Sequence, residues 1–266
     1  MTALAYTVAA ATGSGGIVGL VLGLFGGGGS ILAVPLLVYV VGIASPHVAI
    51  GTSAVAVAAS ALGNLVPHAR GGRVKWRCAG VFAFAGVLGS LLGATAAKAM
   101  DGERLLALFG LVMIGVGLAM SRRRGAVGDS AVRLTWESAG RLLPMLIGIG
   151  FAVGLFSGFF GIGGGFLIVP GLVLATGIPL AYAIGTSLVG VVSFGAATAA
   201  SYALSGLVDW TLAFFFVAGG LAGGWAGAAL GARLAARKQA LGLAFAGLVV
   251  VVGIFIVAKG FGAFFA

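Results

Sequence analysis

Acidic residues and cysteine are scarce in this sequence. Its 266 residues include five Asp and Glu, two His and one Cys, and charged residues make up 8% of the chain, against about 25% in an ordinary soluble domain. The single cysteine, Cys78, excludes an intramolecular disulfide, a Cys-rich metal site and an iron–sulfur cluster. All five acids fall in connections or at the ends of apolar segments. We therefore expect no proton relay, hard-cation site or other metal site at membrane depth.

Sequence signatures of catalysis are also missing. The chain has no Walker motif for ATP, no DDxxD-type acidic pair, and no His placed deep enough to activate a serine. We therefore expect no catalytic residues, no cofactor and no enzyme activity. The net charge of +10 resides in short connections between apolar segments. This favours the positive-inside orientation of a membrane protein over nucleic-acid binding.

Apolar sequence fills most of the chain, with hydrophobic residues at 61%. Because one helical crossing needs about 20 apolar residues, we predict an all-α polytopic membrane protein in contact with lipid. Two of its segments, 30–42 and 165–176, are too short for a hydrocarbon core of ~30 Å. The ten predicted segments are 5–25, 30–42, 47–66, 77–97, 104–121, 141–159, 165–176, 180–203, 211–231 and 239–260.

The second half of the sequence repeats the first. Gly23-Leu-Phe-Gly-Gly-Gly-Gly-Ser-Ile-Leu-Ala-Val-Pro35 aligns with Gly158-Phe-Phe-Gly-Ile-Gly-Gly-Gly-Phe-Leu-Ile-Val-Pro170 at an offset of 135. After a one-residue gap, Ile50-Gly-Thr-Ser53 aligns with Ile184-Gly-Thr-Ser187, and a Gly-x-Val-x-Trp motif follows in each half. We predict two membrane repeats, 1–121 and 141–266, joined by a charged cytoplasmic connection at 122–140.

Charge in equivalent loops indicates how the two repeats are oriented. Loop 67–77 carries four basic residues, whereas its equivalent, 204–210, carries one acid and no base. The next pair of loops, 98–104 and 232–238, reverses this bias. Placing the basic loops in the cytoplasm leaves few bases outside, namely Lys98, Arg104 and Lys259. We therefore predict inverted repeats with both termini outside the membrane.

Glycine clusters interrupt both repeats ahead of the short segments. Without a Cβ atom, glycine lets the chain leave helical geometry, and the following helix then presents unpaired N–H groups and its positive dipole end to an anion. Two equivalent breaks at membrane depth favour a central substrate site over close helix packing alone. Ser30 is also a candidate N-cap. The predicted substrate-binding residues here are Gly26, Gly27, Gly28, Gly29 and Ser30 in the first repeat, and Gly161, Gly163, Gly164 and Gly165 in the second.

Hydroxyl groups recur at equivalent positions of the two repeats. Thr52, Ser53, Thr186 and Ser187 are predicted to contribute to substrate binding. Asn64 is added to the predicted site because it shares one helical face with Ser53. Hydroxyls in membrane helices also bond to their own backbone or to a neighbouring helix, so each one taken singly keeps a structural alternative.

Tryptophan and histidine have simpler expected roles. Trp76 and Trp210 follow the Gly-x-Val motifs and are predicted to mark membrane boundaries. His47 and His68 lie near segment ends, where we favour a surface or packing role and leave a titrating role open.

The two Gly-rich motifs ending at Pro35 and Pro170, together with the two Ile-Gly-Thr-Ser motifs, resemble the sulfite exporter TauE/SafE family of bacterial membrane proteins. The resemblance covers nearly the whole chain. It implies a transporter, usually an exporter, of small sulfur-containing anions such as sulfite, sulfoacetate or other organosulfonates in the bacterial inner membrane. The second copy has Gly165 in place of Ser30, so the two half-sites are not expected to be identical.

From these features we expect a secondary transporter that binds a small anion between the two breaks, near the membrane midplane, and exposes it alternately to each side. Two alternatives stay open at this point. One is an anion channel with a continuously open pathway, and the other is a membrane scaffold or assembly subunit without transport of its own.

Overall fold

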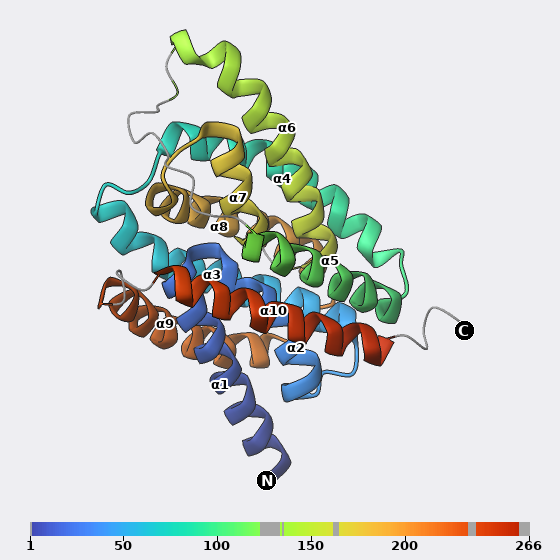
Figure 1. Cartoon of the computed structure of the whole chain (residues 1–266). Helices are drawn as coiled ribbons and strands as arrows, with labels where there is room; N and C mark the ends of the chain where they lie inside the picture. The colour runs from blue at the N-terminus through green and yellow to red at the C-terminus, as the bar shows by residue number, and fades with distance from the viewer. Residues whose placement is uncertain (1, 123–133, 135, 162–164, 234–237, 261–266) are drawn as a thin grey trace.

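The computed structural model describes residues 2–122, 134, 136–161, 165–233 and 238–260. Helices joined by turns and short loops make up this part of the chain (Figure 1). The long helices are α1 (Thr2–Phe25), α3 (Pro46–Arg70), α4 (Trp76–Lys98), α5 (Gly102–Arg122), α6 (Trp136–Phe160), α8 (Leu180–Leu204), α9 (Trp210–Arg233) and α10 (Lys238–Gly260). The shorter elements are η1 (Gly26–Leu32), α2 (Ala33–Leu36), η2 (Leu37–Val41) and α7 (Gly165–Thr176).

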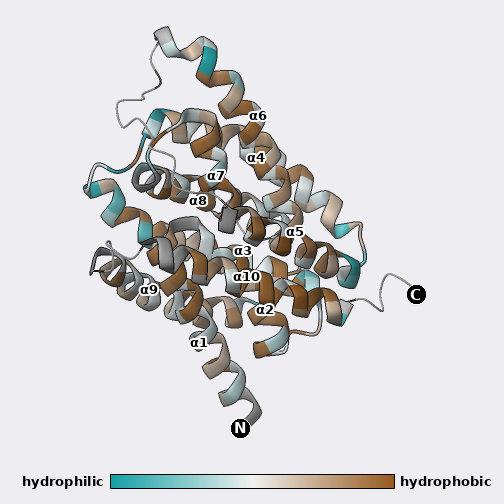
Figure 2. Ribbon diagram, in the orientation of Figure 1, coloured by the Kyte–Doolittle hydropathy of each residue, from teal (hydrophilic) through white to brown (hydrophobic). Residues whose placement is uncertain are grey.

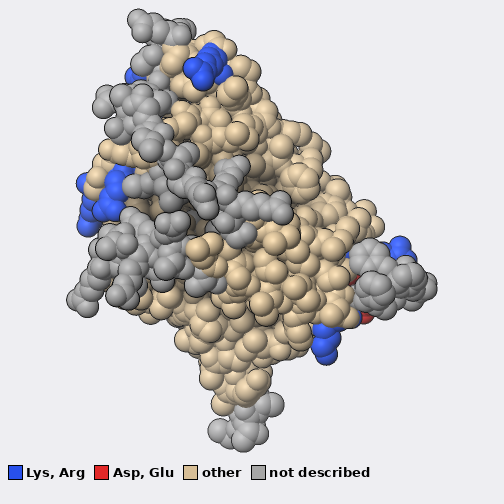
Figure 3. Space-filling model, viewed as in Figure 1, with Lys and Arg blue, Asp and Glu red and all other residues tan. Residues whose placement is uncertain are grey.

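Among the described residues, seven helices are long and apolar enough to cross a membrane, namely α1, α3, α4, α5, α6, α8 and α9. Large apolar side chains on their outer faces are exposed, including Phe84 at 73% and Phe214 at 69%, as expected of surfaces in lipid. Figure 2 shows apolar residues along the helices. On the face seen in Figure 3, the Lys and Arg side chains lie toward the edges, and the described surface between them carries no charge. The chain is a multi-pass membrane protein, which confirms the predicted all-α polytopic fold.

Equivalent helices of the two predicted repeats begin and end alike. Beyond the ends of α3 and α8 lie Gly72 and Gly206, with φ of +64° and +69°, a left-handed conformation that glycine adopts at little cost. The next helices, α4 and α9, begin at Trp76 and Trp210, which are 57% and 62% exposed. This exposure at helix ends agrees with the predicted membrane boundaries.

Glycine-lined contacts join each half of the chain to the other. The first helix of the first half, α1, packs along α9 of the second half, and α6 packs along α4 in the equivalent exchange. A Cβ atom on Gly19 would collide with the carbonyl group of Gly220, and one on Gly154 would collide with Gly86. The two helix pairs therefore approach backbone to backbone, which small residues allow.

Two pairs of helices that correspond to each other in the two halves run antiparallel. Along α5 and α10, Gly110 lies against Val257 and Gly117 against Val250, so residue numbers rise on one helix as they fall on the other. The pair α3 and α8 has the same sense, because Gly51 lies against Leu207, just beyond the end of α8. A two-fold axis that relates antiparallel helices is perpendicular to them, and inverted halves require this geometry.

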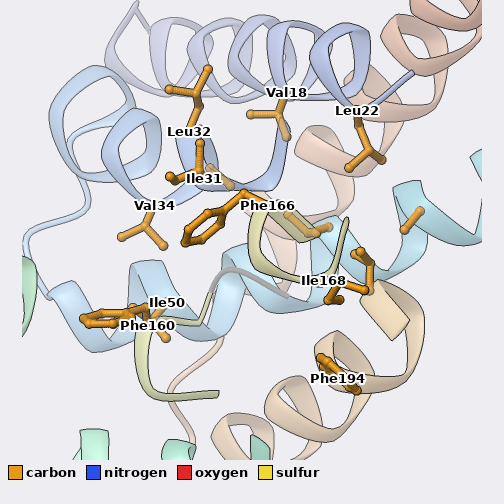
Figure 4. Packing of buried hydrophobic residues seen from close by; sticks show 14 of the residues in the cluster. Val18, Leu22, Ile31, Leu32, Val34, Ile50, Phe160, Phe166, Ile168 and Phe194 are labelled. Carbon is orange, nitrogen blue, oxygen red and sulfur yellow. The ribbon is translucent and has the colours of Figure 1, made fainter. Parts of the chain in front are cut away.

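Apolar side chains fill the space where the two short helical segments meet. η1 and α7 are in contact, and Figure 4 shows the side chains of Ile31, Val34 and Phe166 close together there. These three side chains are exposed by 0%, 1% and 3%, respectively. Among the described residues, packed hydrophobic side chains therefore fill the contact of η1 and α2 with α7.

Candidate functional site

The Ile-Gly-Thr-Ser motifs join the two halves through equivalent hydrogen bonds. Asp209 N donates to Thr52 Oγ1 at 2.9 Å, and Lys75 N donates to Thr186 Oγ1 at 3.0 Å. Asp209 and Lys75 each precede the tryptophan that begins a helix of the other half. Each threonine therefore satisfies a backbone N–H at a helix start. Sequence reasoning missed these partners, although the Gly-x-Val-x-Trp motifs had marked the loops that contain them.

Gly51 and Gly185, which precede the two threonines, leave the space that these loops occupy. A Cβ atom on Gly185 would lie 2.5 Å from the carbonyl oxygen of Arg73, and one on Gly51 would collide with the carbonyl of Leu207. Because both obstacles are backbone atoms, a side chain at either position would push the loop away. The Gly-Thr pair thus holds a loop of the opposite half against α3 or α8.

Ser53 connects the first motif to the second glycine-rich break. Its hydroxyl donates to Ile50 O at 2.8 Å and also lies 3.1 Å from Gly161 O, and the side chain is fully buried. Gly161 follows the end of α6 with φ of +66°, and a Cβ atom there would collide with Ile50. Ser187, the equivalent of Ser53, donates to Ile184 O at 2.8 Å, and its helix, α8, contacts η1 of the first break.

The structure does not bring the two Thr-Ser pairs together. Gly185 lies beside Arg73, which is about 20 residues beyond Thr52 along the chain, or roughly 30 Å at 1.5 Å per helical residue. The motif of α3 instead meets the break that follows α6. The two Thr-Ser pairs therefore lie near opposite ends of the α3–α8 pair, whereas the short segments at the two breaks, η1 and α7, are in contact.

Asn64 lies on the face of α3 that packs against α9. Its Nδ2 donates to Ser60 O at 3.0 Å, and its amide lies beside Gly224. The neighbouring Ser60 hydroxyl is buried against Gly220 and has no hydrogen-bond partner in the described part of the chain. Asn64 and Ser53 thus share a helix, but Asn64 faces Gly224 of α9, whereas Ser53 faces Gly161 at the second break.

The first break differs from the prediction at Ser30. Gly26, Gly27, Gly28, Gly29 and Ser30 all lie within η1, which is a 3-10 helix that follows α1 directly. Ser30 is therefore not an N-cap, because the helical path begins earlier, after Phe25; α2 in turn has Leu32 at its N-cap. The prediction was wrong because glycine without a Cβ atom lets the chain turn back onto α1 as a tight helix. Ser30 itself is fully buried.

The second break is described only at its two edges. Gly161 ends the turn after α6, and Gly165 begins α7, where it is buried. Gly163 and Gly164, which were predicted to bind substrate, lie outside the described residues. The predicted short segment 165–176 coincides with α7.

Lys98, which the predicted topology places outside the membrane without a further role, makes a set of defined hydrogen bonds. Lys98 Nζ at the end of α4 donates to Ser201 O, Ser201 Oγ and Ser205 Oγ at 3.1, 3.0 and 2.9 Å. The signal available in the sequence was a pair of serines four residues apart at the end of an apolar segment.

The described residues provide no metal site, and a hollow found among them lies away from the predicted site. No three His, Cys, Asp or Glu side chains among them are grouped to bind a metal ion. A hollow between α4 and α6 is lined by apolar residues that include Phe84, Leu88 and Phe151. These side chains are exposed, so the hollow faces the lipid and shares no lining residue with the predicted site.

Comparison with known proteins identifies the family. The family model described as "Sulfite exporter TauE/SafE" matches residues 11–256. The chain belongs to the TauE/SafE family. A probable membrane transporter protein of Xylella fastidiosa (strain 9a5c) is 48% identical over 245 residues, which are 92% of this chain and 93% of the relative.

More distant relatives of this TauE/SafE chain carry similar names. A probable membrane transporter protein of Bacillus subtilis (strain 168) is 29% identical over 76% of this chain and 81% of its own length. Another, from Methanocaldococcus jannaschii, is 28% identical over 68% of this chain and 67% of its own length. No solved structure matches the chain significantly.

Proposed function

We propose that this protein is a secondary transporter that exports small sulfur-containing anions, such as sulfite, sulfoacetate or other organosulfonates, across the bacterial inner membrane. The family description names sulfite export, and relatives from several organisms are named as membrane transporters. In this proposal residues 1–121 and 141–266 are inverted repeats, and 122–140 is the cytoplasmic connection. Both termini lie outside.

The observation that carries the proposal is that the helix bearing each Thr-Ser motif meets the glycine-rich break of the other half. Ser53 on α3 bonds to Gly161 at the second break, and α8 contacts η1 at the first. The Ser53 and Ser187 hydroxyls donate to backbone carbonyl oxygens in this structure, and in the proposal they turn to the anion when it binds, together with backbone N–H groups of the breaks. In each half-site the substrate is held by elements of both halves. Its exposure changes when two packed groups of helices, α1 with α3 and α9 and α4 with α6 and α8, move relative to each other.

The packed centre favours alternating access over a channel. Ile31 of η1, Val34 of α2 and Phe166 of α7 are buried against one another between the two predicted half-sites, where a continuously open channel would need an unfilled path. Antiparallel pairing of α3 with α8 and of α5 with α10 supports an exchange between two mirror-like conformations, one open to each side.

Flux measurements on the purified protein in liposomes test the proposal. We expect saturable efflux of radiolabelled sulfite, and faster uptake of label when the liposomes are preloaded with unlabelled sulfite. Replacing Ser53 by Ala is expected to lower the flux. Ser90→Ala is the matched control, because Ser90 is also fully buried and also donates to its own helix, at Val87 O, but lies on α4.

Each alternative function gives a different result in this experiment. Efflux no faster than from protein-free liposomes, for sulfite and for the organosulfonates, would support a scaffold without transport. Flux that never saturates and shows no acceleration by preloading would identify a channel.

A further inference from the structure

Lys98 lies where the ends of two helices from different halves meet. It is near the end of α4, and its ammonium group donates to Ser201 and Ser205 near the end of α8. Its Nζ also lies 5.7 Å from the centre of the Tyr202 ring. Lys98 and Ser201 are half-buried and Ser205 is exposed, so solvent and small solutes reach this group.

The ammonium group of Lys98 is held by neutral oxygen atoms. Asp101, which follows α4, and Asp209, in the loop that follows α8, accept hydrogen bonds from backbone N–H groups. Asp101 Oδ1 accepts from Glu103 N and Arg104 N, and Asp209 Oδ1 accepts from Leu212 N. These carboxylates act as helix caps. All three N–H groups of Lys98 are used by these acceptors, and the Ser205 hydroxyl donates to Ser201 O at 3.1 Å. Because none of the acceptors is ionised, the cluster keeps a net positive charge, and an anion would replace a serine oxygen as acceptor.

Contacts lead from Lys98 to the predicted half-site on α3. The Tyr202 ring lies below the ammonium group, and the Cβ atom of Tyr202 lies 2.9 Å from the position of a Cβ on Gly51. Gly51 precedes Thr52 and Ser53, and Ser53 bonds to Gly161. Lys98 therefore lies at the surface end of a chain of contacts whose inner end is the second break.

The repeat does not reproduce this arrangement on the opposite face. At the offset of 134 that relates the Ile-Gly-Thr-Ser motifs, Lys98 corresponds to Ala232, Ser201 to Pro67 and Ser205 to Gly71. None of these three residues has a side chain that can donate a hydrogen bond. The lysine–serine cluster is therefore specific to one face of the molecule.

We propose that Lys98, Ser201 and Ser205 form a binding site for a small oxyanion at the mouth of the transport pathway on the Lys98 face. The anion, as it passes between the Ser53–Gly161 half-site and the solution, takes the place of serine oxygens as acceptor from the Lys98 ammonium group, and the released hydroxyls donate to it. This inference rests on the proposed anion transport and assigns a face-specific step to it. For an exporter with the predicted topology, it is the last protein site that the anion occupies.

Sulfite exchange across oriented membranes tests the site. Right-side-out and everted vesicles from expressing cells present opposite faces of the protein to added radiolabelled sulfite. For Lys98→Met we expect the half-saturating sulfite concentration to rise about 10- to 100-fold on the Lys98 face, since a hydrogen-bonded charge is lost. On the opposite face we expect no change. Ser205→Ala should have a smaller effect in the same direction.

Two further variants separate binding from structural support. Lys98→Arg keeps the charge and should restore most of the affinity. Lys259→Met removes another lysine, which lies 6.0 Å from the Phe255 ring centre on α10, and should leave both faces unchanged. This control accounts for any general effect of surface charge.

Failures of the site and of the transport proposal give different results. If the unsubstituted protein exchanges no sulfite and no organosulfonate in either orientation, both the transport proposal and this site are refuted. If the unsubstituted protein exchanges anion but Lys98→Met matches it on both faces, the site is refuted and transport stands. A loss of affinity that is equal on both faces would mean that Lys98 only caps α8, which also refutes the site.

Discussion

Gly29 and Gly28 are adjacent glycines of the first break for which the structure predicts opposite responses to the same substitution. η1 folds back on α1, so a Cβ atom on Gly29 would lie 2.8 Å from both Val18 O and Val21 C. A Cβ atom on Gly28 would instead meet the edge of the Phe245 ring at 3.4 Å. The first obstacle is backbone within a helix, and the second is a side chain at ordinary contact distance.

We expect Gly29→Ala to destabilise the protein by about 1 to 3 kcal/mol, the usual range for a group forced into a packed interior. Such a change corresponds to a fall of about 2 to 12 °C in the melting midpoint, by the scale that holds for soluble proteins of similar size. Gly28→Ala should shift the midpoint by much less, because the ring can adjust. Neither glycine has a positive φ, so the difference between them is one of space and not of backbone strain.

The chain contains its own reporter for this measurement. Cys78 is the single cysteine and is 1% exposed, so a thiol-reactive fluorogenic probe labels it only as the protein unfolds. Melting curves of the two variants and the unsubstituted protein can be recorded in one detergent. Equal midpoints for Gly29→Ala and Gly28→Ala would refute the packing of η1 against α1.

Three further predictions concern the junctions between halves, the topology and the energy source. Thr52→Val should lower the stability by about 1 kcal/mol, because Asp209 N loses its acceptor, whereas Thr52→Ser keeps the acceptor and should not. Equal melting midpoints of the two variants would contradict this. With Cys78 replaced by Ala, single cysteines at the equivalent exposed positions Arg70 and Leu204 should react with an impermeant reagent from opposite sides, and reaction from one side would exclude inverted halves. Sulfite efflux should respond to a K⁺–valinomycin potential by about 2.3 kcal/mol per charge per 100 mV; voltage-independent flux that requires a pH or Na⁺ gradient would refute uncoupled export.

Most helices were predictable because their signals are local. Apolar runs bounded by charge, glycine or proline predicted segments such as 180–203 and 211–231, and the structure has α8 at Leu180–Leu204 and α9 at Trp210–Arg233. The prediction of a helix over residues 30–42 was less accurate. The helical path there begins at Gly26 in 3-10 geometry, because η1 packs on Val18 and Leu22 of α1. That packing of η1 on α1 is a tertiary contact, and a run of glycines has no hydrophobic periodicity from which it could be predicted.

The candidate site was predictable in its residues but not in their grouping. Thr52 and Thr186 were expected in one site because they occupy the same motif. When equivalent helices run antiparallel, equivalent residues that lie away from the centre are carried to opposite ends. The partners Asp209 and Lys75 contribute backbone N–H groups, which no side-chain motif identifies. The structure was therefore needed to find that each motif serves the opposite half.

The hydrogen bonds around these motifs indicate which contacts an alternating movement must break. α1, α3 and α9 contact one another, and α6, α4 and α8 form the equivalent group. The bond from Asp209 N to Thr52 lies within the first group, and the bond from Lys75 N to Thr186 lies within the second. The bond from Ser53 to Gly161 O crosses between the groups, as does the contact of η1 with α7. Under the proposed mechanism the threonine bonds persist while the Ser53 bond opens, so Ser53 stands where the moving interface and the predicted substrate site coincide.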